Sequence, residues 1–355
     1  KIMAVIFKES FIDRWFKTCS IQFWSIGSAE NISFTNIKKN PGLYASILAK
    51  SGIRDQDVLY QMDSDFKLSE MLRSTLFITV LSIFILFVSL STSIIFNPLF
   101  SIPAGVIIFL YIVIAIYSSF YYDRSRMTFY KDYIYFTRGI FFKEFYYVLY
   151  DNVKDITTIR YPFSKTGSIK FNVAGEHIVD QGKNPSMISN SFRIDYIDNI
   201  DTKDELIDMI FHQRPDQQRI RQIEENIQGY SPKPILSSRQ DLANSLTGLM
   251  IISVIIFPLI ILLPITLTFV IWSVKVRYYS IQPYRVISRS GILYKKQISI
   301  VFNKIDHINY SQGMFNKMFK NGNITVNTAG SSTPELVINN IHDFKEFYDV
   351  LKEHY

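Results

Sequence analysis

The sequence predicts a membrane protein of the α+β class, in which transmembrane helical hairpins are each followed by a β-rich domain that ends in a helix. Three observations lead to this prediction. Two long stretches, residues 74–122 and 242–274, contain no Asp, Glu, Lys or Arg. The segments that follow them share one order of strand-like runs and turn glycines. Each of these segments then closes with an amphipathic helical pattern.

The first uncharged stretch has 49 residues, whereas a bilayer-spanning helix needs about 20 apolar residues. Pro98 and Pro103 lie in its middle, and proline ends helices because it lacks an N–H and clashes with the preceding turn. We therefore expect a transmembrane hairpin over residues 72–122, with helices at 76–96 and 104–122. The alternative is a hairpin buried in a large soluble core, although such cores rarely run so far without a charge.

The second uncharged stretch has 33 residues, more than one span needs and fewer than two full spans need. Pro258 and Pro264 again lie in the middle. Basic residues flank the stretch on both sides: Lys233, Arg239, Lys275 and Arg277. Because basic residues collect on the cytoplasmic side, this favours a short transmembrane or re-entrant hairpin over residues 242–274. A single crossing is the alternative.

The charge is distributed unevenly along the chain. The net charge is +7 in total, with +2 in residues 1–73, 0 in residues 123–241 and +5 in residues 275–355. A basic segment beside a membrane points to anionic lipid headgroups as partners, at about 1 kcal/mol per near-surface cation. Nucleic acid is the other usual partner of basic surfaces, and we expect none here because the segment is tethered to the bilayer. A solvated basic face is the alternative.

The middle and C-terminal segments repeat one plan. Gly139 and Gly291 mark the same turn, and a DNVKDI or NKIDHI step begins twelve residues after each glycine. A strand ending in Ala-Gly follows in both segments, and a helical pattern closes both. We therefore expect two equivalent domains, at residues 123–213 and 275–355.

Residues 1–55 contain only the second half of this plan. Residues 12–27 align with residues 315–330 at a constant offset, and the strands that should come earlier are missing. We expect a first domain truncated to its C-terminal half, so that the chain begins inside its first repeat. A polar linker is expected at residues 214–241, which contain three prolines and four glutamines before position 235.

These segments resemble a known family. Two hydrophobic helices precede a YYxI or TFYxxYI strand, an RxGI or RGI turn, the DNVKDI or NKIDHI step and an IxVxTAG or IKFNVAG strand. This order resembles the bacterial pleckstrin-homology-like (bPH class two) membrane proteins of the YdbS/YdbT type. The resemblance implies a PH-like fold, a bent antiparallel sheet forming a partly open barrel capped by a C-terminal helix. It implies no catalytic activity, and some relatives are associated with resistance to membrane-active peptides, including bacteriocin immunity.

Motifs for catalysis or metal binding are absent from the sequence. The five histidines are scattered, and Cys19 is the only cysteine, so no pair has zinc-ligand spacing. Neither phosphate-binding glycine motif occurs, and there is no GxSxG elbow. The uncharged stretches also lack histidine, which argues against a transporter with an ion pathway. We predict a protein that is not an enzyme and that has no cofactor and no metal.

The resemblance to PH-like folds suggests that cations near the open barrel end hold anionic headgroups. The candidates are Arg285, Lys295, Lys296, Lys317 and Lys320. Neighbours in a strand point to opposite faces, so we expect only some of these side chains to converge. Aromatic residues with polar tips favour membrane interfaces. The predicted interface anchors are Tyr121, Tyr122, Trp272, Tyr278 and Tyr279.

The predicted function is that of a non-enzymatic, multi-pass protein of the cell membrane with its PH-like domains in the cytoplasm. These domains are expected to bind the lipid surface or protein partners, including a partner membrane protein of the same family. A role in resistance to membrane-active peptides or bacteriocins is the expected physiology. The alternative is an accessory subunit of a membrane transporter or membrane enzyme.

Overall fold

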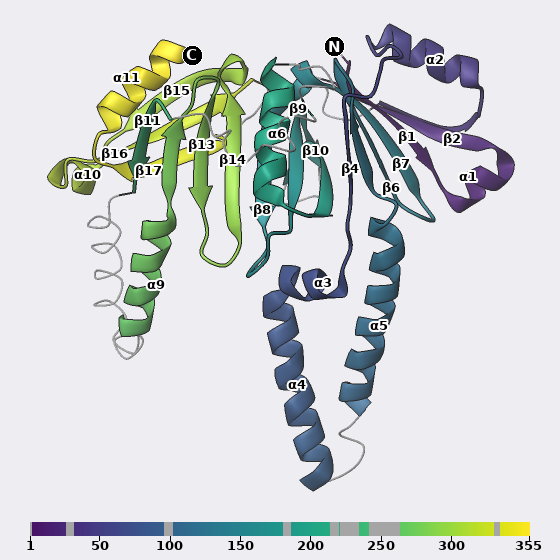
Figure 1. The fold of residues 1–355 in the computed structure, drawn as a ribbon, viewed down its shortest axis with the longest axis horizontal. Helices are drawn as coiled ribbons and strands as arrows, with labels where there is room; N and C mark the ends of the chain where they lie inside the picture. The colour runs from purple at the N-terminus through teal and green to yellow at the C-terminus, as the bar shows by residue number, and fades with distance from the viewer. Residues whose placement is uncertain are drawn as a thin grey trace.

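Three antiparallel β-sheets make up most of the structure, a computed structural model of the chain (Figure 1). It describes residues 2–25, 32–95, 102–179, 186–213, 220, 234–240, 263–329 and 334–355. The fold class is therefore mainly β, and the prediction of a membrane fold built on repeated transmembrane hairpins is wrong.

The first sheet has seven strands. In spatial order they are β3 (Ile32–Lys38), β2 (Thr18–Ser25), β1 (Ile2–Glu9), β7 (Lys143–Leu149), β6 (Tyr133–Arg138), β5 (Arg126–Phe129) and β4 (Tyr60–Asp63). The second sheet repeats this plan with β10 (Ser186–Ile197), β9 (Gly167–Val179), β8 (Val153–Arg160), β14 (Lys295–Val301), β13 (Arg285–Ser290), β12 (Tyr278–Ile281) and β11 (Leu236–Arg239). The third sheet has only β15 (Ile305–Ser311), β16 (Gly322–Thr328) and β17 (Leu336–Ile341).

Each seven-stranded sheet joins two successive repeats. We call strands β1–β3, β8–β10 and β15–β17 three-stranded half-sheets, and strands β4–β7 and β11–β14 four-stranded half-sheets. The first sheet joins β1 to β7, and the second joins β8 to β14, both antiparallel. The register is the same at both junctions. Phe7 lies opposite Phe145, which is six residues after Gly139, and Thr158 lies opposite Gln297, which is six residues after Gly291.

A helix covers each three-stranded half-sheet. These helices are α2 (Pro41–Lys50), α6 (Ile200–Gln213) and α11 (Phe344–His354). The burial of β16 alternates strictly along the strand, as a period of two requires. Its inner side chains pack with Phe347 and Leu351 of α11 and with Ile300 of β14 in one core. The core of each complete repeat thus lies between a four-stranded and a three-stranded half-sheet.

The segment of the predicted hairpin at residues 72–122 folds into three helices, and the last two lie where helices were predicted, at residues 76–96 and 104–122. The three helices are α3 (Leu68–Ser74), α4 (Leu76–Ile95) and α5 (Ile102–Tyr122). Within the part of the chain searched, no single helix is both long and apolar enough to cross a bilayer. By length and composition alone, only α3 taken together with Ile78–Ser89 could cross a bilayer, and these two helical segments are bent by 95° relative to each other.

The prediction of a hairpin at residues 242–274 falls mainly outside the described residues. The described part is a single helix, α9 (Leu263–Val276), of 14 residues. In Figure 1, α4, α5 and α9 extend from the sheets on the same side of the molecule.

The apolar helices interrupt the β-domains and do not simply precede them. Strand β4 comes before α3, α4 and α5, and its partner β5 comes after them. In the same way β11 comes before α9, and its partner β12 follows it. The first strand of each four-stranded half-sheet therefore lies within a segment that the sequence patterns did not identify as β.

Candidate functional site

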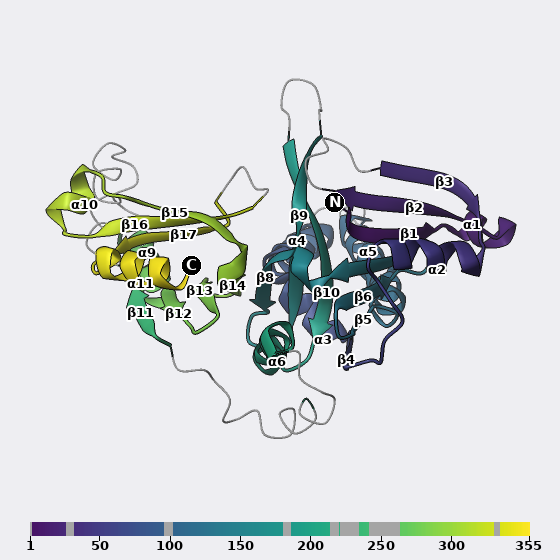
Figure 2. The same ribbon diagram turned by 90° about the horizontal axis from the view of Figure 1, so that it is seen from above.

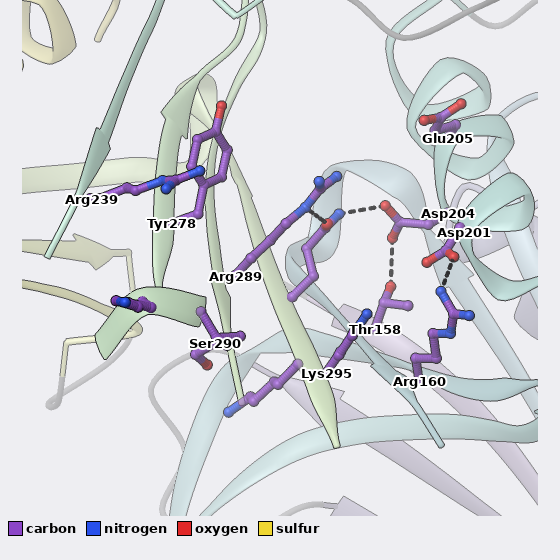
Figure 3. Close-up of a pocket in the computed structure, with 14 residues that line it drawn as sticks. Thr158, Arg160, Asp201, Asp204, Glu205, Arg239, Tyr278, Arg289, Ser290 and Lys295 are labelled. Atoms are coloured by element: carbon purple, nitrogen blue, oxygen red, sulfur yellow. Dashed lines mark hydrogen bonds and ion pairs between the residues drawn. The ribbon is translucent and has the colours of Figure 1, made fainter. Parts of the chain in front are cut away.

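A cavity of about 570 Å³ lies between the middle and C-terminal repeats (Figure 3). Strand β8 and helix α6 form one wall, and strands β11–β14 with the end of α9 form the other. The lining residues are Thr158, Arg160, Asp201, Asp204, Glu205, Arg239, Lys275, Val276, Tyr278, Arg289, Ser290, Lys295, Lys296 and Gln297. The cavity exists because β8 pairs with β14 and so brings two repeats together.

The lining is rich in positive charge. Six of its side chains are basic and three are acidic, which gives a formal net charge of +3. The acids all belong to α6, and Figure 3 shows their carboxylates on the side opposite Arg239, with Arg289 between them. Five of the six cations are exposed to solvent: Arg239, Lys275, Arg289, Lys295 and Lys296. The cavity therefore presents a basic rim over a partly acidic floor.

Hydrogen bonds occupy two of the three carboxylates. The buried Asp204 accepts hydrogen bonds from Thr158 Oγ1 and from Gln297 Nε2, both at 2.5 Å. Gln297 Oε1 in turn accepts a hydrogen bond from Arg289 Nε. Asp201 forms an ion pair with Arg160 at 2.7 Å. Asp204 thus connects the two repeats, whereas Asp201 pairs within the middle repeat, and most of the basic rim has no acidic partner among the described residues.

Four rim cations form no ion pair among the residues that the structure describes. They are Arg239, Lys275, Lys295 and Lys296. Arg289 is hydrogen-bonded to a neutral amide only, within the same part of the chain. A ring of exposed cations around a hollow of this size suits an anion with several oxygens, because Arg and Lys form charge-assisted hydrogen bonds to phosphate.

Burial raises the pKa of two carboxyls at the floor. The pKa of Asp204 is raised by burial, against the opposing effect of Arg285. Burial, with the neighbouring charge of Asp204, raises the pKa of Glu205 to about 7. Glu205 therefore takes up a proton near neutral pH, and the cavity becomes more positive as the pH falls through 7.

The structure separates the five predicted headgroup-binding residues. Lys295 and Lys296 line the cavity. Arg285 is only 3% exposed and lies beneath it, 3.1 Å from Asp208 and 4.0 Å from Asp204, so its charge is already balanced. The remaining two, Lys317 and Lys320, line a separate open hollow of about 530 Å³. Two acidic side chains, Asp343 and Glu346, line the same hollow.

The predicted interface aromatics also separate. Trp272 is 54% exposed on α9, and Tyr278 lines the cavity. Tyr121 and Tyr122 end α5, where the ring of Tyr122 lies edge-on to that of Tyr196 at 4.6 Å. Tyr279 is 3% exposed and packs in the core of the C-terminal repeat, so it has no exposed ring for a membrane interface.

A second hollow, of about 680 Å³, lies behind the turn between β13 and β14. Its lining includes Ser74 and Tyr122 from the ends of α3 and α5, together with Lys296. The hydroxyl of Tyr294 donates a hydrogen bond of 2.9 Å to the Ser74 carbonyl. The turn that precedes Lys295 and Lys296 therefore contacts the point where the apolar helices leave the sheets.

Sequence reasoning missed the half of the cavity that comes from the middle repeat. Thr158, Arg160 and the α6 carboxylates of the cavity are 90 or more residues away from Lys295 and Gln297 in the sequence. No local pattern indicates that β8 pairs with β14. One feature of the sequence could have indicated Arg239 and Lys275 as site residues, because both flank an uncharged stretch.

Comparison with known families supports a PH-like domain in the C-terminal third of the chain. Residues 240–355 match the family model of the bacterial PH domain. This match covers α9, strands β12–β17 and α11. No curated protein matches the sequence. The chain therefore contains a bacterial PH-like domain, and most of the basic rim lies in it.

Proposed function

We propose that the protein acts at the cell membrane, where the basic cavity holds the anionic headgroup of a lipid. One observation carries this proposal: exposed cations without acidic partners among the described residues surround a cavity that the end of the apolar helix α9 also lines. A phosphodiester headgroup offers the oxygens that such a rim binds. The cytoplasmic leaflet is rich in anionic lipids, so we place the PH-like domains on that side.

The surface of α4 and α5 supports a lipid environment. Large apolar side chains are exposed on both helices, including Phe84 at 63%, Phe87 at 70% and Phe109 at 64%. Soluble monomers rarely expose apolar patches larger than a few hundred Å². Contact with lipid would remove this surface from water, and Lys295 and Lys296, which follow the turn between β13 and β14, would then lie close to the headgroups.

Titration with short-chain lipids tests the headgroup site without the contribution of the apolar helices. The full chain in a neutral detergent is titrated calorimetrically with dihexanoyl phosphatidylglycerol, with dihexanoyl phosphatidylcholine and inorganic phosphate as comparators. We expect binding of the anionic lipid, weaker binding of phosphate and none of the zwitterionic lipid. Equal binding of phosphate and anionic lipid would indicate a free anion as the ligand, and no binding of either anion would refute the site.

Two variants with the same change in charge locate the binding. The cavity variant combines Arg239→Gln, Lys275→Gln, Arg289→Gln and Lys295→Gln. The control variant combines Lys317→Gln, Lys320→Gln, Lys345→Gln and Lys352→Gln, all exposed and outside the cavity lining. We expect the cavity variant to lose binding and the control to keep it. Equal losses in both would show that net charge, and not the cavity, governs binding.

The physiological role that we propose is resistance to membrane-active peptides, and its support is the family resemblance. A deletion strain should be more sensitive to bacteriocins than its parent, and the cavity variant should fail to restore resistance. Unchanged sensitivity of the deletion strain would exclude this role while leaving the lipid site unaffected.

A further inference from the structure

Strand β15 is the first strand of its three-stranded half-sheet. Among the residues that the structure describes, it is the only such first strand that lies at a sheet edge. Its counterparts β1 and β8 are the first strands of the other three-stranded half-sheets, and both are internal. Each pairs with the last strand of a four-stranded half-sheet, β7 or β14. The remaining sheet edges recur: β3, β10 and β17 are equivalent to one another, and so are β4 and β11. Only the position of β15 differs between repeats.

We propose that β15 pairs, antiparallel, with the last strand of a four-stranded half-sheet in a PH-like domain that lies outside the described residues. The two junctions within this chain provide the template, since both have the same register. A second copy of the described residues offers no such strand, because β7 and β14 are already paired on both sides. The partner strand therefore lies outside the described residues, in another PH-like domain.

The edge of β15 is well suited to pairing. The strand has seven residues and contains neither Lys nor Pro, which natural proteins use to block exposed edges. Its side chains at positions 306, 307 and 309–311 are exposed, while Ile308 packs in the core. A strand added to such an edge gains a full row of backbone hydrogen bonds.

A second contact at the first junction points to the same partner. Helix α1 (Phe11–Phe16) follows β1, and Arg14 on it donates hydrogen bonds to the carbonyls of Ile140 and Phe141, at 2.8 and 3.3 Å. These carbonyls belong to the turn before β7. Helix α10 (Met314–Met318) occupies the equivalent place after β15 and carries Lys317 at the position of Arg14.

The backbone confirms this equivalence. Lys17 after α1 and Lys320 after α10 share a left-handed conformation, with φ of 54° and 55°. Lys317 is exposed and forms no ion pair among the described residues. In the proposed complex its ammonium group donates to the turn carbonyls of the partner, as Arg14 does within the chain.

Site-directed photo-crosslinking of the full chain in cells of the source organism tests this pairing. The photoreactive residue p-benzoylphenylalanine replaces Asn309, which is exposed on β15. The control replaces Val337, which lies in the same row on β17 at the opposite edge, since Thr325 of β16 is paired with both. We expect a cross-linked protein at position 309 and none at position 337.

The register predicts where the cross-link falls. Asn309 is equivalent to Ile6 and Thr157, whose partners Tyr146 and Ile298 are each seven residues after a turn glycine. The cross-linked peptide should therefore come from a PH-like domain and include the residue seven positions after its turn glycine. A peptide from the described residues of this chain, a peptide from a protein without a PH-like domain, or no cross-link at position 309 would overturn the proposal.

Substitution of Lys317 tests the helix contact. Lys317→Gln should reduce the yield of the cross-link at position 309, whereas Lys352→Gln, an exposed change at the far end of α11, should not. Equal yields from the two variants would overturn the role given to Lys317. The result does not depend on the lipid site, because Lys317 lies outside the cavity.

Discussion

Gly139 and Gly291 set the same turn in two repeats. Their φ angles are +97° and +95°, in a region that side chains rarely adopt. A Cβ atom at Gly291 would lie 1.9 Å from the carbonyl oxygen of Tyr294, and one at Gly139 would lie 1.8 Å from that of Phe142. Both glycines are needed for conformation and for space, which explains why the sequence repeat includes them.

Gly291→Ala should destabilise the protein by about 2 kcal/mol or more, because it combines an unfavourable φ with a backbone clash. Chemical denaturation followed by fluorescence measures this change. Gly313→Ala is the matched control, since a Cβ there would meet open space. Similar losses in both variants would contradict the explanation.

Glu205 should make stability and binding depend on pH. Its pKa is about 7 in the folded protein against a usual value of 4.5, so the folded state binds more protons between these two values. Stability therefore falls as the pH rises through this window. Glu205→Gln should stabilise the protein by about 2 kcal/mol at pH 8 and have little effect at pH 4. Denaturation at both pH values tests this, and a benefit at pH 4 that equals the benefit at pH 8 would contradict it.

At the residue scale, the turn glycines were predictable and the Asp204 network was not. The glycines repeat with their neighbours at a fixed distance from the next step, so the pattern is local. Asp204 and Gln297 are separated by 93 positions. Their hydrogen bond depends on which strand edge pairs with which, and no local property of either residue specifies this.

Helix α11 shows how an amphipathic pattern becomes a domain cap. Phe344, Phe347 and Leu351 are buried at the predicted spacing, and the ring of Tyr348 contacts that of Tyr310 at 5.0 Å. Phe347→Ala should cost about 3–5 kcal/mol, because it removes a fully buried ring from the core. Chemical denaturation measures the loss. Tyr348→Ala should cost clearly less, and the reverse order would show that α11 packs on another face.

The contact between α6 and β14 should stabilise the pairing of the two repeats. Asp204→Ala removes the acceptor of two buried hydrogen bonds and one carboxylate near Arg285, so it should cost about 2 kcal/mol or more. Asp201→Ala is the control, since its pair with Arg160 is largely exposed and should contribute at most about 1 kcal/mol. Denaturation curves of the two variants compare these costs, and equal losses would contradict the assignment.

At the element scale, the long periodic segments were predictable and the shortest strands were not. Strand β16 alternates and α11 has helical spacing, so each pattern identifies its element. Strands β4 and β11 have only four residues each and lie before apolar segments. Four residues are too few for a clear alternation, and the pairing partner lies beyond the helices.

At the scale of the whole molecule, successive PH-like repeats are joined through continuous sheets. Alternation along a strand specifies which face is buried, but it does not specify which strand lies at each edge. The sequence therefore indicated separate repeated domains, whereas the two junctions place half of each domain in a shared sheet (Figure 2). The basic cavity is a product of this arrangement, because its two walls belong to different repeats.

The preference of the protein for anionic membranes follows from the cavity. The full chain is allowed to distribute between vesicles of phosphatidylcholine and vesicles that also contain phosphatidylglycerol, so that apolar contacts common to both cancel. Each rim cation should contribute about 1 kcal/mol near the surface, and the preference should fall as salt shortens the Debye length below about 8 Å. We predict a salt-sensitive preference for the anionic vesicles that the cavity variant loses and the control variant with equal charge retains. An equal distribution between the two vesicle types, or an equal loss in both variants, would contradict the central claim that this cavity binds anionic headgroups.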